Sequence, residues 1–227
     1  MNRFDPSLLP PKPDLKLERD LWACDLLHVA GIDEAGRGAL AGPVVAGVVI
    51  FQPDKSLMDS MNGVRDSKQM SPEKRQVWAL RIKSSAAAWG VANASQEEID
   101  HLGIVPATRL AVQRALQACK FKPDHLLLDY LFLPDIDIPQ TKLVKGDQRS
   151  LSVAAASVLA KTDRDSQMVE LDKKFPGYHL GENKGYGTSS HLEAIARLGP
   201  SPIHRKTFAP MKTSARSLTE ELDQMED

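Results

Sequence analysis

The segment that most restricts the fold is Gly31-Ile32-Asp33-Glu34-Ala35-Gly36-Arg37-Gly38, which leaves a short apolar run and precedes Gly42-Pro43 and the β-branched run 44–50. Residues 36–41 match the dinucleotide-binding pattern G-x-G-x-x-[G/A]. That pattern requires a helix directly after the glycines, because the helix N-terminus meets the pyrophosphate. The proline and the strand-like run argue against such a helix. Asp33 and Glu34 would also repel a pyrophosphate unless a cation lay between them, so the segment favours a metal site over an NAD site.

Short runs of apolar or β-branched residues, bounded by Gly, Pro, Asp or Lys, predict five strands at 28–32, 44–50, 88–92, 125–128 and 143–145. Helices are predicted after Ser71-Pro72, at a capping box of Ser95 and Glu98, over 109–119, over 151–173, and from Ser190 with Glu193 to Gly199. The small apolar residues 153–160 should pack against the sheet. Strands before residue 146 and helices after it predict an α/β layered domain with a helical C-terminal part.

Acidic residues lie at or just after several of the predicted strands. Asp33 and Glu34 stand before the Gly-rich turn, Asp129 ends the run His125–Leu128, and Asp147 follows Lys145-Gly146. In an open α/β sheet, sites collect at the strand ends, so these carboxylates could converge. Carboxylate oxygens suit magnesium or manganese, and two such ions about 4 Å apart are a standard device for phosphoryl displacement. The residues alone therefore predict metal-dependent phosphate chemistry.

Charge does not identify the partner. Lys plus Arg total 29 and Asp plus Glu total 30, a formal net charge of −1, which argues against a strongly basic nucleic-acid coat. The basic stretch Arg205, Lys206, Lys212 and Arg216 fits either a phosphate-binding strip or an ordinary solvated face. The glycines around Arg37 fit either close backbone approach to a sugar-phosphate chain or a plain tight turn. Both pairs of alternatives stay open at this point.

Several features favour a cytoplasmic protein. The longest apolar run, 44–51, is far shorter than the roughly 20 residues of a membrane helix, so no membrane partner is expected. The N-terminus lacks the pattern of a secretory signal. Cys24 and Cys119 are far apart in the sequence and neither belongs to a CxxC motif. This favours reduced cysteines that pack in the fold over a disulfide or a zinc site.

Seven short motifs occur in one order along the chain and together resemble bacterial ribonuclease HII. They are Gly31–Gly38, Asp66-Ser67-Lys68, Leu128-Asp129, Lys145-Gly146-Asp147, Ala154–Lys161, Asn183-Lys184-Gly185-Tyr186-Gly187 and His204–Phe208. The resemblance implies a ribonuclease H-like fold with a mixed five-stranded sheet. It also implies a divalent-metal endonuclease that cleaves RNA within RNA–DNA hybrids and at single ribonucleotides embedded in DNA, leaving 5′-phosphate and 3′-hydroxyl ends. Roles in ribonucleotide excision and RNA primer removal follow from the same resemblance.

The resemblance also implies roles for individual residues. Asp33, Glu34, Asp129 and Asp147 match the family's four acidic catalytic residues, the first three being its principal ligands for Mn²⁺ or Mg²⁺. Gly36, Arg37 and Gly38 match the turn whose backbone contacts the 2′-hydroxyl, the group that separates RNA from DNA. Tyr186 matches a tyrosine that stacks on the deoxyribose after the ribonucleotide. Lys68 and Lys161 are expected to meet phosphates, and Asp163 and Asp165 are rival acids with a simpler surface role.

The expected organisation is an N-terminal extension over 1–27, a catalytic domain over 28–213 and an acidic tail over 214–227, in a monomer. Ribonuclease HIII is disfavoured because its added N-terminal domain would not fit in about 27 residues. Two other classes remain as alternatives. A resolvase or transposase-type nuclease would share the carboxylates without requiring a 2′-hydroxyl, and a non-catalytic nucleic-acid-binding module would need no carboxylates at all.

Overall fold

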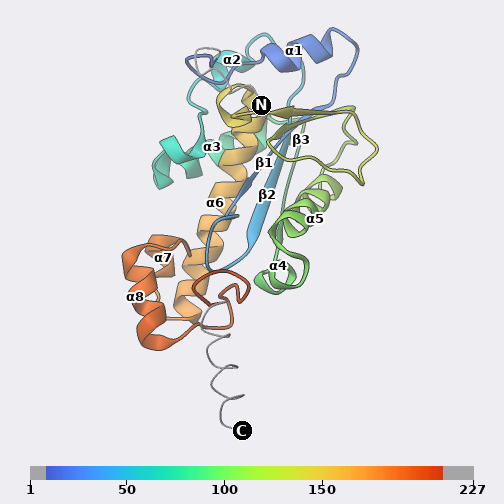
Figure 1. The fold of residues 1–227 in the computed structure, drawn as a ribbon. Coiled ribbons are helices and arrows are strands. Elements are labelled where there is room, and N and C mark those ends of the chain that lie inside the picture. The colour runs from blue at the N-terminus through green and yellow to red at the C-terminus, as the bar shows by residue number, and fades with distance from the viewer. Residues whose placement is uncertain (1–8, 212–227) are drawn as a thin grey trace. The chain divides into compact units, whose positions relative to one another are not determined.

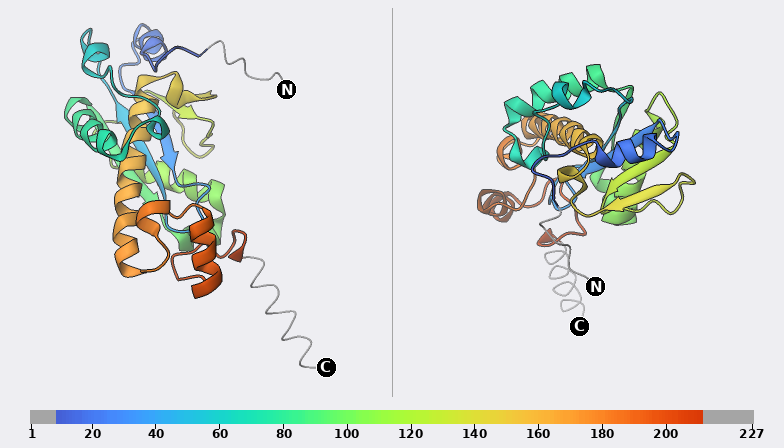
Figure 2. Two further views of the ribbon diagram at one scale, coloured as in Figure 1. Left: turned by 90° about the vertical axis from the view of Figure 1, so that its left-hand side faces the viewer. Right: turned by 90° about the horizontal axis from the view of Figure 1, so that it is seen from above.

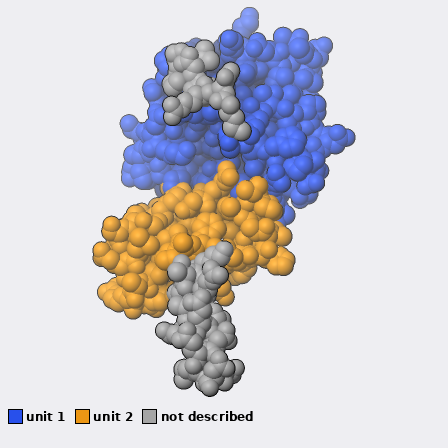
Figure 3. Space-filling view, in the orientation of Figure 1, with its two compact units in different colours: residues 1–35, 45–93, 108–163 blue, residues 36–44, 94–107, 164–227 orange. Residues whose placement is uncertain are grey.

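The computed structural model describes residues 9–211, which divide into two compact units (Figure 3). Unit 1 comprises residues up to 35, 45–93 and 108–163, and unit 2 comprises 36–44, 94–107 and residues from 164 onward. The predicted acidic tail and the basic residues Lys212 and Arg216 lie outside the described residues. Each unit is described by itself.

Unit 1 is built on a mixed five-stranded sheet in the order β3-β2-β1-β4-β5 (Figure 1). The central strand β1 (Val29–Ala35) pairs antiparallel with β2 (Val44–Ile50) and parallel with β4 (His125–Asp129). Strand β5 (Gln140–Leu143) pairs parallel with β4, and β3 (Ala88–Ala94) lies at the other edge. The predicted mixed sheet is confirmed.

The last strand is displaced from its predicted position. Residues 143–145 were expected to form it, but β5 spans Gln140–Leu143 and shares only Leu143 with that range. The physical reason is the backbone of Lys145, which adopts a left-handed conformation at φ 55° and ends the extended chain before the 3₁₀ helix η3 (Gly146–Gln148). Asp147 therefore lies in a helical turn beyond the sheet.

Most helix starts follow the predicted capping residues. The side chain of Ser71 caps α3 (Pro72–Ser85), and Ser95 with Glu98 forms the expected capping box of α4 (Gln96–Leu102). Helix α5 (Ile104–Gln117) begins earlier than predicted, and α6 spans Leu151–Lys174. Helix α8 (Ser189–Leu198) is capped by Thr188 instead of Ser190, because the Thr188 hydroxyl accepts the backbone N–H of His191. The short helices are α1 (Lys16–Trp22), α2 (Leu57–Ser60), η2 (Ser67–Gln69) and α7 (Leu180–Asn183).

The first half of α6 packs against the sheet of unit 1, as the small residues in 153–160 predict (Figure 2). Two glycines allow the close approach. A Cβ at Gly31 would overlap the main chain of Ser152, and a Cβ at Gly47 would overlap the carbonyl of Ala156. The helix and strands β1 and β2 thus meet at backbone distance, which fixes α6 beside the acidic strand.

The N-terminal segment also joins unit 1. Leu15 is buried in its core, and Glu18 on α1 is fully buried. The Glu18 carboxylate accepts the hydroxyl of Ser150 at 2.6 Å, and both the backbone N–H and the hydroxyl of Ser152. Burial raises the pKa of Glu18, and these hydrogen bonds partly offset the effect. Glu18 therefore caps the N-terminus of α6 from another part of the chain.

Unit 2 has a small core of its own, formed by Ala41, Met168, Tyr178, Leu180, Ala194 and Ile195. It contains α4, α7, α8 and the C-terminal part of α6.

Both cysteines are free, and Cys24 is exposed and therefore not the packing residue expected from the sequence. None of the helices within the described residues is long and apolar enough to cross a membrane.

Candidate active site

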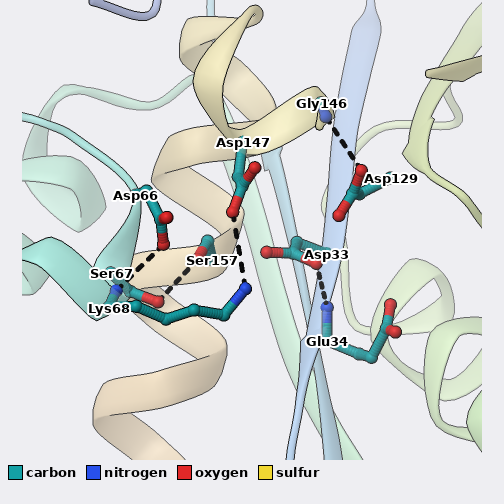
Figure 4. Close-up of polar contacts among 9 residues, drawn as sticks. All are labelled: Asp33, Glu34, Asp66, Ser67, Lys68, Asp129, Gly146, Asp147 and Ser157. Atoms are coloured by element: carbon teal, nitrogen blue, oxygen red, sulfur yellow. Dashed lines mark hydrogen bonds and ion pairs between the residues drawn. The ribbon is translucent and has the colours of Figure 1, made fainter. Parts of the chain in front are cut away.

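Four carboxylates come from three elements of unit 1 (Figure 4). Asp33 and Glu34 lie within β1, Asp129 is the last residue of β4, and Asp147 lies in η3. Because Ile32 pairs with Leu128 in parallel register, the next residue on each strand is an aspartate. Strand pairing therefore brings Asp33 and Asp129 together, whereas the side chain of Glu34 points away from Asp33.

The loop carrying Asp147 is held by Asp129 itself. The Oδ1 atom of Asp129 accepts the backbone N–H of Gly146 at 2.8 Å. The backbone N–H of Ser150 in turn donates to the carbonyl of Gly146 at 2.9 Å. These two bonds fix η3 against the end of β4, so the position of Asp147 depends on that of Asp129.

Asp33 is strongly disfavoured as an anion in this setting. It is 6% exposed, and burial raises its pKa well above the usual range, with further contributions from Glu34, Asp129 and Asp147. One hydrogen bond acts in the opposite direction, because the backbone N–H of Glu34 donates to Asp33 Oδ1 at 2.8 Å. Without a bound cation, this setting therefore favours the protonated, neutral form of Asp33.

Asp147 responds in the same way. Burial raises its pKa to about 6, and the neighbouring Asp66 and Asp129 add to the shift. Lys68 partly opposes it, since its Nζ atom lies 3.7 Å from Asp147 Oδ2. Burial alone would lower the pKa of Lys68, but the surrounding carboxylates outweigh it and raise that pKa.

Asp66 is the residue that sequence reasoning missed as a member of the cluster. It is 6% exposed, and its Oδ1 atom accepts the backbone N–H of Lys68 at 2.9 Å, which caps η2. The next residue, Ser67, shares a 2.7 Å hydrogen bond with Ser157 on α6. The motif Asp66-Ser67-Lys68 was a signal in the sequence, but only Lys68 was predicted from it to have a functional role.

The donor set suits a hard divalent cation. Within residues 9–211, no three His, Cys, Asp or Glu side chains are yet arranged to hold one metal ion. The chemistry nevertheless fits, because carboxylate oxygens are the preferred ligands of Mg²⁺ and Mn²⁺. A bound cation would stabilise the ionised form of a buried aspartate that lies among other carboxylates. Lys68 cannot replace such a cation fully, because its side chain is 77% exposed to solvent.

Unit 2 carries the predicted Gly-Arg-Gly turn, Gly36–Gly38. Gly36 has φ 92°, and a Cβ there would overlap the guanidinium of Arg164. The carbonyls of Gly36 and Arg37 accept hydrogen bonds from Arg205 at 2.7 and 2.8 Å. Arg205 is fully buried, so the prediction that it joins an exposed basic strip is wrong. Its guanidinium fixes the main chain of the turn instead of meeting solvent.

Tyr186 lies in a loop that is tied to the same turn. The carbonyl of Gly185 accepts the backbone N–H groups of Leu40 and Ala41 at 2.7 and 3.3 Å. The guanidinium of the buried Arg164 lies 5.3 Å from the Tyr186 ring centroid and donates to the carbonyls of Pro43, Lys184 and Ala41. The structure thus brings the Gly-Arg-Gly turn and Tyr186 into one hydrogen-bonded assembly.

The remaining predicted residues lie on α6. Lys161 is half-buried on this helix, in unit 1, and its contact with phosphate stays a prediction. Asp163 and Asp165 follow it, and Asp165 favours the charged form of Arg164 by raising the pKa of that guanidinium, against the larger effect of burial. Asp165 therefore serves the scaffold of unit 2.

The mixed sheet that carries these aspartates is similar to that of ribonuclease H-like enzymes, as two solved structures show. The crystal structure of ribonuclease H2 from Pyrococcus horikoshii OT3 matches with a TM-score of 0.67 and 27% identity, over 82% of this chain and 96% of that one. The RNase HII in the PCNA:RNase HII complex from Archaeoglobus fulgidus matches with a TM-score of 0.66 and 25% identity, over 80% and 95%.

Sequence comparison narrows the class. The family model described as Ribonuclease HII matches residues 30–211. A ribonuclease HII of Dehalococcoides mccartyi is 51% identical over 196 residues, which cover 86% of this chain and 92% of the relative. The chain belongs to the ribonuclease HII family and is an enzyme.

Proposed function

We propose that this protein hydrolyses the RNA strand of RNA–DNA hybrids and incises at single ribonucleotides embedded in duplex DNA, leaving 5′-phosphate and 3′-hydroxyl ends. Endoribonuclease activity on RNA–DNA hybrids is the activity of its family. The single observation that carries the proposal is the convergence of Asp33, Asp129 and Asp147, which parallel strand pairing and the hydrogen bond from Gly146 to Asp129 bring together. Ribonucleotide excision and RNA primer removal are the processes that this cleavage would serve.

Divalent-metal dependence belongs to the same proposal. Asp33, Glu34 and Asp129 would hold the ions, Mg²⁺ or Mn²⁺, and Asp147 would stand at the edge of the cluster. When bound, such ions polarise the phosphodiester and lower the pKa of a coordinated water. Lys68 binds Asp147 and would place its ammonium group beside the substrate phosphate. Asp129 orients Asp147 through the backbone of Gly146.

Substrate recognition is assigned to unit 2. The turn Gly36–Gly38 would contact the 2′-hydroxyl through its backbone, and the 2′-hydroxyl is the group by which a protein tells RNA from DNA. Arg205 supports this role because it fixes two carbonyls of the turn. Tyr186 would stack on the following deoxyribose, and Lys161 would contact a phosphate.

We also propose that the protein acts as a monomer in the cytoplasm, where chromosomal RNA–DNA hybrids occur in bacteria. The RNase HII from Archaeoglobus fulgidus, whose structure is similar to this chain, forms a complex with PCNA. Light scattering after size-exclusion chromatography measures the oligomeric state. A mass near 24.9 kDa is expected.

The function is tested on matched duplexes that contain no, one or four ribonucleotides, each with added magnesium and with a chelator. Cleavage is expected only at ribonucleotides and only with metal. Cutting of the all-DNA duplex would instead indicate a resolvase or transposase-type nuclease. Binding without cleavage in magnesium and in manganese would indicate a non-catalytic nucleic-acid-binding module.

A further inference from the structure

Two buried histidines lie next to each other in unit 2 outside the carboxylate cluster. His191 on α8 and His204 in the C-terminal segment are 0% and 1% exposed. Their Nε2 atoms are 3.1 Å apart, which is hydrogen-bond distance. Hydrogen bonds at the far nitrogen of each ring determine which of the two donates.

At one end, Nδ1 of His204 lies near three groups of Ser201: the backbone N–H at 3.0 Å, the hydroxyl at 2.9 Å and the carbonyl at 3.3 Å. The N–H can only donate and the carbonyl is the farthest of the three, so these contacts favour an Nδ1 that carries no proton. At the other end, Nδ1 of His191 lies 2.9 Å from the carbonyl of Tyr186, which can only accept. A neutral imidazole has one N–H, so His204 carries its proton on Nε2 and donates to Nε2 of His191. The partners thus assign one direction to the whole chain, from Ser201 through His204 and His191 to Tyr186.

The surroundings keep both rings neutral. Burial lowers the pKa of His191, and burial together with His191 lowers that of His204 to about 4. The ring of Tyr178 packs on His204 with centroids 4.9 Å apart. Arg205 follows His204 in the chain, and Arg164 and Asp100 act electrostatically on Arg205. Asp100 also accepts the backbone N–H groups of Lys206 and Thr207.

This series of hydrogen bonds ends at Tyr186, the residue proposed above to stack on the substrate. Tyr186 O accepts from His191, Gly185 O accepts from Leu40 and Ala41, and Arg164 covers the Tyr186 ring. The residue after His204 is Arg205, which holds the carbonyls of Gly36 and Arg37. One short segment therefore holds the Gly-Arg-Gly turn directly and the tyrosine loop through His191.

We infer that His191 is a positioning residue for substrate selection, which fixes the main chain of Tyr186 through Nδ1, and that His204 sets the tautomer of His191. This inference rests on the proposed role of Tyr186 at the RNA–DNA junction. The pair contributes no group to the metal site. Its loss should alter the preference between substrates while metal dependence stays the same.

Two conservative variants of His191 distinguish the contact that Nδ1 makes with Tyr186 from the contact that Nε2 makes with His204. In His191→Asn, the amide can stand near the position of Nδ1 and donate to Tyr186 O, whereas in His191→Gln it stands near Nε2 and keeps the contact with His204. The measured quantity is kcat/KM on a single embedded ribonucleotide divided by kcat/KM on a continuous hybrid. We expect this ratio to fall about tenfold in His191→Gln and less than twofold in His191→Asn.

Tyr178→Phe is the matched control, because it removes the hydroxyl that donates to Gly199 O while keeping the ring on His204. It should lower the melting temperature and leave the ratio unchanged. An equal fall in His191→Asn and His191→Gln, or a similar fall in Tyr178→Phe, would overturn the inference. Tyr186→Ala distinguishes the two proposals, because an unchanged ratio in that variant removes the junction role of Tyr186 itself.

The tautomers are measured independently of activity in ¹⁵N-labelled wild-type protein. Long-range ¹H–¹⁵N spectra should assign the proton to Nδ1 in His191 and to Nε2 in His204, in the absence of metal and substrate. The opposite assignment for either ring would overturn the inference even if the His191 variants failed to fold.

Discussion

Asp33 and Asp147 in unit 1 and Arg164 and Arg205 in unit 2 are all buried, yet the partners of the two pairs differ. Asp33 is surrounded by other carboxylates, and a single backbone N–H donates to it among the hydrogen bonds described. Arg205 and Arg164 are instead surrounded by backbone carbonyls, to which their nitrogens donate at 2.7–3.2 Å. In unit 2, the protein itself supplies hydrogen-bond acceptors for the buried guanidinium groups, although burial still lowers the pKa of Arg205 to about 9.

This difference separates two uses of buried charge. A buried ion without enough partners raises the free energy of the folded chain and thereby favours a ligand of opposite charge. A buried ion with several acceptors fixes the groups that it binds. Unit 1 is therefore suited to bind cations, and unit 2 is suited to hold a rigid main chain, which is what the proposed substrate-binding turn requires.

The largest expected effect follows from changing a carboxylate of unit 1. Asp129→Asn should keep the fold but lower single-turnover cleavage by at least about a hundredfold, because a metal ion supplies several kcal/mol of charge stabilisation and each 1.4 kcal/mol is a factor of ten. Asp147→Asn, at the edge of the cluster, should lose less and recover partly in raised manganese.

Asp124→Asn is the control for that experiment, since Asp124 precedes β4 at its other end. It should cleave at the wild-type rate. Near-wild-type cleavage by a folded Asp129→Asn protein would remove Asp129 from the metal ligands and, with it, the proposed contrast between the two units.

A smaller effect is expected from disturbing the satisfied guanidinium of unit 2. Gly36→Ala places a Cβ against Arg164 at a left-handed φ, and strained backbone and overpacking each cost of order 1–3 kcal/mol. Urea unfolding should therefore report a loss of at least about 2 kcal/mol. Gly38→Ala is the matched control, because a Cβ there meets nothing within 4 Å, and should change stability by less than about 0.5 kcal/mol. Equal stabilities would mean that Arg164 moves freely and that the turn is not rigidly held.

The smallest expected effect concerns the stability of the metal-free protein. A carboxyl group whose pKa rises on folding costs nothing below its unfolded pKa of about 3.8 and destabilises increasingly as the pH rises toward the folded pKa. For Asp147 this window runs from about 3.8 to about 6. The melting temperature of Asp33→Asn in chelator should thus exceed that of the wild type by a few degrees at pH 7, and the gap should close toward pH 4.

Saturating magnesium supplies the complementary measurement, because it should raise the melting temperature of the wild type more than that of Asp33→Asn. Asp124→Asn should follow the wild type throughout. An equal dependence of the melting temperature on pH in wild type and Asp33→Asn would show that folding does not raise the pKa of Asp33.

Local signals in the sequence were enough for much of the fold. Strand β2 was predicted with its observed bounds, and Ser71-Pro72 and Ser95 with Glu98 marked helix starts correctly, because their hydrogen bonds join residues three positions apart. The end of β5 and the cap of α8 were misplaced by a few residues. In both cases a neighbouring residue, Lys145 or Thr188, had the decisive backbone or side-chain geometry.

Long-range partners limited the prediction of the site. Arg205 was interpreted as part of an exposed strip because composition records its charge but not the carbonyls that lie 168 and 169 positions earlier in the chain. Asp66 was overlooked for a similar reason, since its influence on Asp147 arises only from folding. Strand pairing accounts for the expected meeting of Asp33 and Asp129, whereas Asp147 lies in η3, which a hydrogen bond from Gly146 holds against Asp129.

The cap that Glu18 provides for α6 has a consequence for synthesis of the chain. Glu18 is translated 132 residues before Ser150, its hydrogen-bond partner directly before that helix. At a translation rate of about 5–20 residues per second, roughly 7–26 seconds pass between the synthesis of Glu18 and that of Ser150. The capping hydrogen bonds between α1 and α6 cannot form during this interval, although the residues of α1 are among the first to be translated.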